Sequence, residues 1–133
     1  MLKPDFDKYS LALIRGDEII FSINGQGLRP LVDCLRKYAQ TKEKLILHDK
    51  VIGLAAARLV VYSGMIFAVH TRLVSRPAQK FLEENDIELY AEEVAANILT
   101  KDRRAICPGE IIALAMVDPD EFDKQIKAML GNS

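Results

Sequence analysis

The sequence predicts an α/β fold, arranged as a three-layer α/β/α sandwich with a mixed β-sheet. Three observations lead to this prediction. Strand-like and helix-like patterns alternate along the chain, an early hairpin requires antiparallel strands, and a later strand–helix–strand segment requires parallel ones. The 133 residues are predicted to form a single domain over 1–133, because domains commonly contain about 100–150 residues.

Composition excludes several classes of protein. Half of the residues are hydrophobic and 28% are charged, which is typical of a globular domain and not of a disordered chain. The net charge of −1 gives no sign of nucleic-acid binding. No apolar run reaches the roughly 18 residues that a membrane span needs, and the first residues do not resemble a signal peptide. We therefore predict a cytoplasmic protein with neither nucleic-acid nor membrane partners, whose cysteines are free thiols.

The first part of the chain predicts a hairpin, a helix and a strand. Leu11–Ile14 and Ile19–Ile23 are rich in β-forming residues and flank the polar turn 15–18. Apolar residues recur at helical spacing over Leu28–Tyr38, which predicts an amphipathic helix. The short apolar run Leu45–Leu47 predicts the next strand.

The middle of the chain predicts a buried helix and a strand–helix–strand unit. Val51–Tyr62 is nearly uncharged, so we expect a buried helix with Asp49 as a cap near its start. Met65–Val69 follows as a buried strand. A helix that opens at Ser75–Pro77 and an alternating strand over Ile87–Tyr90 complete the unit, which predicts parallel strands joined by a right-handed crossover.

The last third of the chain is predicted to be helical. Glu92–Leu99 is a short helical pattern, and Pro108–Met116 is another nearly all-apolar one. A final amphipathic helix begins at Asp118–Pro119, where an acidic cap precedes a proline at the first helical position, and it continues to Leu130.

The most informative candidate for chemistry is Cys107. Pro108 suits the first position of a helix, which makes Cys107 the N-cap and Glu110 the third helical residue, with a thiol in place of the usual hydroxyl. The helix terminus and the neighbouring Arg103 and Arg104 favour a thiolate, as a nucleophile requires. The alternative is a small, buried apolar residue, since free cysteines are among the most buried residue types.

The other polar candidates also have two interpretations. Asp49 is either a helix cap or a carboxylate on the floor of a pocket, and one residue can serve as both. Cys34 lies at helical spacing within an amphipathic helix and is predicted to be core, and both histidines are predicted to be structural. The chain has no Cys-x-x-Cys and no His-x-Glu, so we predict neither a metal site nor a cofactor.

Three segments together resemble a bacterial family, the domain of unknown function 1893, which is assigned to the cytidine-deaminase-like fold. These segments are Asp49–Gly53 with its alanine-rich helix, Ser75–Ile87 and Ile106–Glu110. The resemblance implies a three-layer sandwich. In a deaminase, the helix after Asp49 would carry the first zinc ligand and a catalytic glutamate, and the helix opened by Pro77 would carry the remaining ligands.

The positions that correspond to the deaminase zinc site are different in this chain. They hold Asp49, Val51, Ala78 and Phe81. Because none of these is a thiolate or an imidazole, the resemblance implies that the protein does not deaminate through a zinc-bound hydroxide.

Three hypotheses about function follow. The first is an enzyme on a small metabolite, with a deaminase-like pocket that lacks the zinc ligands; its catalytic residues are Cys107 as nucleophile, Asp49 as base or orienting carboxylate, and Glu110. The second is a module that binds a nucleotide-like small molecule without catalysis. The third is a structural protein that forms a homo-oligomer through apolar helix faces.

Overall fold

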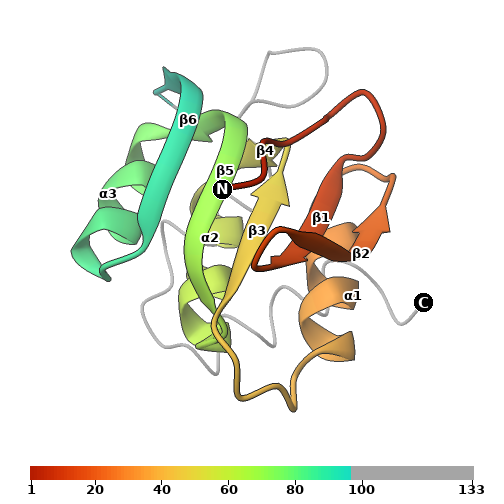
Figure 1. Ribbon diagram of the computed structural model, residues 1–133. Helices are drawn as coiled ribbons and strands as arrows, with labels where there is room; N and C mark the ends of the chain where they lie inside the picture. The colour runs from red at the N-terminus through yellow and green to blue at the C-terminus, as the bar shows by residue number, and fades with distance from the viewer. Residues whose placement is uncertain (97–133) are drawn as a thin grey trace.

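The computed structural model describes residues 1–96 and has a mixed α/β architecture (Figure 1). The elements in chain order are β1 (Leu11–Arg15), β2 (Glu18–Ile23), α1 (Arg29–Lys37), β3 (Leu45–Asp49), β4 (Val51–Ile52), α2 (Leu54–Ser63), β5 (Ile66–Ser75), α3 (Arg76–Glu84) and β6 (Glu88–Ala95). The α/β class and the mixed sheet are confirmed. The predicted helices over 108–116 and 118–130 lie outside the described residues.

The strands form one mixed, six-stranded sheet. β1 pairs antiparallel with both β2 and β3, which confirms the predicted hairpin, while β3, β4 and β6 all pair parallel with β5. β6 pairs with β5 from Ala68 to Ser75. The same stretch of β5 also pairs with β3, up to His70, and with β4, at Leu73 and Val74. β3 and β4 therefore share the other edge of β5 and are two pieces of one broken strand.

The predicted helix over Val51–Tyr62 is wrong at its start. Val51 and Ile52 form β4, and the helix begins at Leu54 after an extended Gly53 (φ −93°, ψ 180°). Both residues are β-branched, and a parallel partner is available to them in β5. Asp49 is consequently not the cap of this helix, and instead ends β3.

The predicted helix over Glu92–Leu99 is wrong for its described part. Residues 92–95 continue β6, where Val94 pairs with Val74 and Ala95 with Ser75. β5 is itself longer than predicted, since it runs to Ser75 and not only to His70. Pairing between β5 and β6 along these extra residues gives hydrogen-bond partners to backbone N–H and C=O groups. The local helical pattern of residues 92–95 contains no sign of this distant partner.

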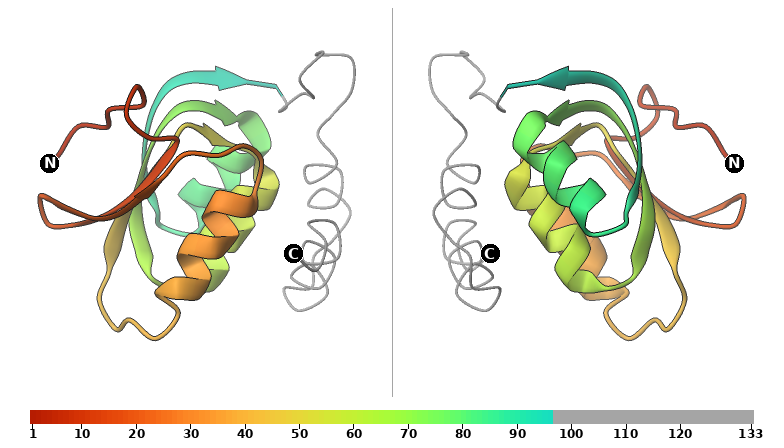
Figure 2. Two further views of the ribbon diagram at one scale, coloured as in Figure 1. Left: turned by 90° about the vertical axis from the view of Figure 1, so that its right-hand side faces the viewer. Right: turned by 90° about the vertical axis from the view of Figure 1, so that its left-hand side faces the viewer.

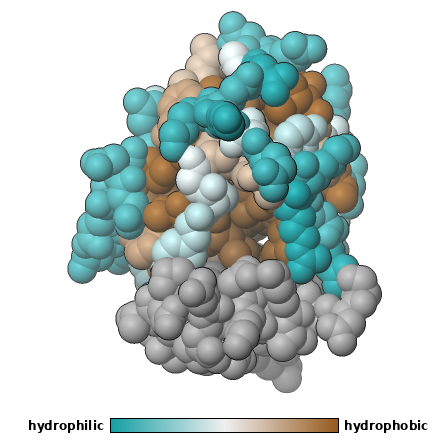
Figure 3. All heavy atoms as spheres, turned by 90° about the horizontal axis from the view of Figure 1, so that it is seen from below, coloured by the Kyte–Doolittle hydropathy of each residue, from teal (hydrophilic) through white to brown (hydrophobic). Residues whose placement is uncertain are grey.

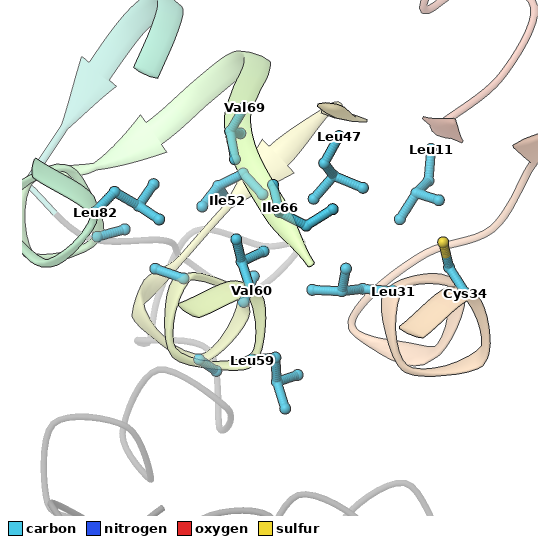
Figure 4. Close-up of a cluster of buried hydrophobic side chains, with 14 of the residues drawn as sticks. Leu11, Leu31, Cys34, Leu47, Ile52, Leu59, Val60, Ile66, Val69 and Leu82 are labelled. Atoms are coloured by element: carbon cyan, nitrogen blue, oxygen red, sulfur yellow. The ribbon is translucent and has the colours of Figure 1, made fainter. Parts of the chain in front are cut away.

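The two faces of the sheet are covered differently. Figure 2 shows α1, α2 and α3 on one face and the N-terminal residues on the other. The larger core lies under the helices, where Leu31 and Val60 point toward Leu47 and Ile66 of the sheet (Figure 4). Seen from below, hydrophobic residues gather in the middle of the described part, between hydrophilic residues on both sides (Figure 3). A second layer of helices, as in the predicted sandwich, stays a prediction.

The face opposite the helices carries its own smaller core. Residues of β1, β3 and β5 that alternate with those of the larger core contribute to it, and the N-terminal segment covers them. Its members are Tyr9, Ala12, Ile14, Ile46 and Ala68, with Leu2 and Phe6 packed against them. Side-chain alternation along the strands thus builds two apolar surfaces, as expected for a sheet covered on both faces.

Candidate functional site

Asp49 lies at the break between β3 and β4. It pairs with Leu11 of β1 and alternates with His48, so its side chain lies on the helix-covered face with that of Leu47. Burial raises the pKa of the Asp49 carboxyl well above its ordinary value, although the backbone N–H groups of Val51 and Lys50 act to lower it. Such a carboxyl holds its proton at a higher pH than usual, as a general acid or base needs.

The structure brings Asp49 close to Cys34, the other cysteine. The Cys34 side chain is fully buried on α1 and points toward Leu11 (Figure 4), which confirms the prediction that it belongs to the core. Burial raises the pKa of the Cys34 thiol to about 12, and the charge of Asp49 adds to this rise, while Lys37 opposes it. Cys34 is therefore a neutral, unreactive thiol.

Cys107 and Glu110 lie outside residues 1–96, which are the part of the chain that the structure describes. Their predicted pocket with Asp49 accordingly stays a prediction.

A second group of polar side chains lies on the opposite face of the sheet. His48 of β3 is completely buried there, and its Nδ1 is 2.8 Å from the hydroxyl oxygen of Tyr9. That oxygen accepts a hydrogen bond from the backbone N–H of Asp5 (3.1 Å). The other ring nitrogen of His48, Nε2, is buried and has no hydrogen-bond partner among the described residues. A buried polar atom of this kind is rare and calls for an explanation.

Strand register places three rings side by side, and Tyr9 of the N-terminal segment adds a fourth; we call these four rings the aromatic row. His48 is opposite His70 of β5, and His70 is opposite Tyr90 of β6. The ring centroids of the two histidines are 5.1 Å apart in an edge-on arrangement, and those of His70 and Tyr90 are 4.6 Å apart and stacked. Tyr9 stacks on the far side of His48 at 6.1 Å. The aromatic row thus leads from the buried rings of Tyr9 and His48 to the exposed ring of Tyr90.

Both imidazoles of the aromatic row are neutral at neutral pH. Burial, with a smaller contribution from the neighbouring His70, lowers the pKa of His48 to about 4, although the backbone of Leu2 acts to raise it. Burial also lowers the pKa of His70. Neutral imidazoles carry a nitrogen lone pair that can accept a proton or bind a metal ion.

An open pocket of about 580 Å³ lies beside the exposed end of the aromatic row. The N-terminal residues 3–7 form one wall, and residues 70–72 of β5 and 89–92 of β6 form the other. Inside it, Arg72 pairs with Glu92 (3.5 Å), and its guanidinium lies 5.6 Å from the ring centre of Phe6. The pocket therefore combines aromatic faces with charged groups.

Sequence reasoning missed this second group because it treated both histidines as structural. The signal was present, since each histidine directly follows a predicted strand and the two strands were expected in one sheet. Neighbouring parallel strands in register bring such residues together.

The model of one protein family matches almost the whole chain. It is described as TM1506, domain of unknown function (DUF1893), and it matches residues 5–130. The chain belongs to the DUF1893 family. The predicted resemblance is thereby confirmed at the level of the family.

A solved structure supports the assignment to DUF1893. The crystal structure of the DUF1893 family protein TM1506 from Thermotoga maritima has a TM-score of 0.76 and 26% sequence identity to the chain. The similarity covers 91% of this chain and 80% of the other. No curated protein matches the chain. Within residues 1–96 of this DUF1893 protein, no helix is both long and apolar enough to cross a membrane.

Proposed function

We propose that this DUF1893 protein binds a small molecule with a planar heteroaromatic ring, such as a nucleobase or nucleoside, in the pocket beside the aromatic row. The observation that carries the proposal is that the pocket opens on Tyr90, which is 46% exposed and whose ring is backed by His70. A ring held by a neighbour offers a stacking surface at little cost in side-chain entropy. The volume of about 580 Å³ lies in the range of ligand pockets.

The charges that line the pocket favour an uncharged ligand. Three carboxylates, those of Asp5, Asp7 and Glu92, face two cations, those of Lys3 and Arg72. Arg72 is already paired with Glu92. A phosphate group in this pocket would therefore meet more like charge than opposite charge, which disfavours a nucleotide relative to its nucleoside.

A thermal-shift panel of nucleobases, nucleosides and nucleotides tests this proposal. We expect at least one uncharged ring compound to raise the melting temperature, because a ligand at 100 times its Kd stabilises a fold by about 2.7 kcal/mol. Tyr90→Ala should abolish the shift and Tyr90→Phe should retain it. Tyr62→Ala, which removes an exposed tyrosine from α2, is the matched control. Unaltered binding in Tyr90→Ala, or no stabilising compound, would contradict the proposal.

A second candidate function is a cysteine-dependent enzyme with Cys107, Asp49 and Glu110 in one pocket. The specific observation in its favour is the raised pKa of Asp49 at the break between two strands, where the carboxyl is suited to exchange protons. This proposal includes the three-layer, cytidine-deaminase-like arrangement, without the zinc ligands of that fold. Its supports in residues 1–96 are the mixed sheet and the helices on one face.

Alkylation with iodoacetamide tests the second candidate, and Cys34 provides an internal control. Because Cys34 is buried, with a pKa raised to about 12, we expect only Cys107 to react in the folded protein. A nucleophilic Cys107 should react with a pKa below about 8.5, the value of a free thiol. Asp49→Asn should shift that pKa if the two groups share a pocket. A pKa of Cys107 at or above the value of a free thiol would exclude Cys107 as the nucleophile.

Three further expectations stay predictions: the cytoplasmic location, the bacterial origin and the homo-oligomer. Light scattering at increasing protein concentration tests the last of these. A monomer at high concentration would count against it.

A further inference from the structure

We propose that Met1, His48 and His70 form a binding site for Cu(I), a soft monovalent metal ion, beneath the N-terminal segment. The site adjoins the ring-binding pocket, which shares His70 and Tyr90 with it, but the metal proposal does not rest on ring binding. Its donors are one thioether sulfur and two imidazole nitrogens. Figure 2 shows the N-terminus on the face of the sheet opposite the helices, and from there the Met1 side chain reaches His70 of β5, the strand that pairs with β3 and its His48.

Two of the three donor atoms are in contact, and the third belongs to the neighbouring ring. The Met1 Sδ is 2.8 Å from the Nε2 of His70. The ring of His48 lies edge-on to that of His70, with centroids 5.1 Å apart and planes 64° apart. The His48 Nε2, buried and without a hydrogen-bond partner among the described residues, supplies an independent observation that points to a ligand. An ion bound to it would satisfy an atom that otherwise costs free energy to bury.

The kind of donor decides the kind of metal. Thioether sulfur is a soft ligand that selects Cu(I), and imidazole also suits copper. Zinc sites are built from thiolate, imidazole and carboxylate groups. In residues 1–96, no three side chains of His, Cys, Asp or Glu gather as such a site would require. The third donor here is the thioether of Met1, which favours Cu(I) over zinc.

Neighbouring groups hold both imidazoles in orientations suited to metal binding. The Tyr9 hydroxyl forms a hydrogen bond with the His48 Nδ1, so Nε2 is the nitrogen of that ring left for a metal ion. Tyr90 stacks on His70 and fixes the plane of its ring. Partners of this kind set the tautomer and direction of a histidine ligand, and their loss commonly weakens metal binding by 10- to 100-fold.

Anaerobic titration with Cu(I) against a colorimetric Cu(I) chelator tests the proposal. The Cys107→Ser chain is used as the parent throughout, so that no reactive thiol competes, and Cys34 is buried. We expect one ion per chain and at least about tenfold weaker binding in each of three variants. His48→Asn retains a partner for Tyr9 at the Nδ1 position, His70→Phe retains the stack on Tyr90, and Met1→Leu, made behind a cleavable tag, removes the thioether.

Met65→Leu is the matched control, because it removes a methionine from the core and exchanges side chains of similar volume. It should bind Cu(I) as the parent does. Unchanged affinity in the three ligand variants, or no Cu(I) bound by the parent, would overturn the proposal. An equal affinity for Zn(II) would overturn the choice of metal.

An NMR measurement on the chain with Met1, His48 and His70 unchanged tests the proposal even if a variant fails to fold. The chain has four methionines, so methyl-labelled methionine gives four resonances. One equivalent of Cu(I) should shift the Met1 methyl resonance and the Nε2 resonances of both histidines. A Met1 resonance that stays in place would overturn the site.

Discussion

Lowering the pH from 6.5 to 4 is expected to destabilise the protein by roughly 2–3 kcal/mol through His48 alone. Burial lowers the pKa of this imidazole from 6.5 to about 4. Between these two values the unfolded chain binds a proton that the folded chain does not, so the free energy of unfolding increases with pH. The contribution is complete above pH 6.5 and is lost as the pH falls toward 4.

Urea denaturation at a series of pH values from 4 to 7.5, for the parent chain and His48→Asn, measures this effect. Asparagine retains a hydrogen-bonding group near the Tyr9 hydroxyl but does not titrate, so the variant should show a flatter dependence of stability on pH. His70, whose pKa is also lowered, adds to the slope in both proteins, and the difference between them isolates His48. Identical slopes would show that His48 does not titrate differently on folding.

Local sequence patterns predict those elements that their own residues determine. The hairpin of β1 and β2 and the helix α1 were found because strand alternation and helical spacing are properties of short segments. The helix α3 was found from its cap, and the Ser75 Oγ indeed accepts a hydrogen bond from the Ala78 N–H (3.2 Å). No knowledge of distant partners was needed for these elements.

The elements that were misjudged depend on a distant partner. Val51–Ile52 precedes a long apolar helix without a charge between them, and only the pairing with β5 makes it a strand. Glu92–Ala95 becomes a strand for the same reason. Gly53 is the local signal that could have separated β4 from α2, since a glycine commonly marks a change of backbone direction.

The candidate sites likewise combine features that local sequence determines with features that depend on distant residues. Asp49 ends the strand β3, which is where the sequence pattern places it, but its surroundings depend on the strand break and on α1, and its role in a site stays a prediction. The sequence indicates that each histidine follows a strand, but it does not assemble the whole aromatic row, because the row requires the register of three strands and the path of the N-terminal segment. Register is set by which residues are buried across the whole sheet, and that information is not local.

Asp49→Asn is expected to raise the stability of the folded protein at pH 8 by at least about 1 kcal/mol, in the range that unsatisfied buried polar groups cost. Because burial raises the pKa of this carboxyl, the folded chain retains a proton that the unfolded chain releases. The stability of the parent chain therefore falls as the pH rises from 3.8 through the folded pKa, opposite in sign to the effect of His48. The variant lacks this fall, so its advantage should vanish at low pH.

Two measurements check this expectation. Urea denaturation at pH 4 and pH 8 should show the gain only at the higher pH, and Asp17→Asn, in the exposed turn before β2, should show none. Titration of the Cys34 thiol should give a lower pKa in Asp49→Asn, because the negative charge of Asp49 contributes to the rise in the parent. A variant less stable than the parent at pH 8 would mean that the charged carboxylate stabilises the fold. If the variant is instead more stable, and Cys107 also loses reactivity in it, the carboxylate costs stability and serves the chemistry of the site, a trade-off typical of active sites.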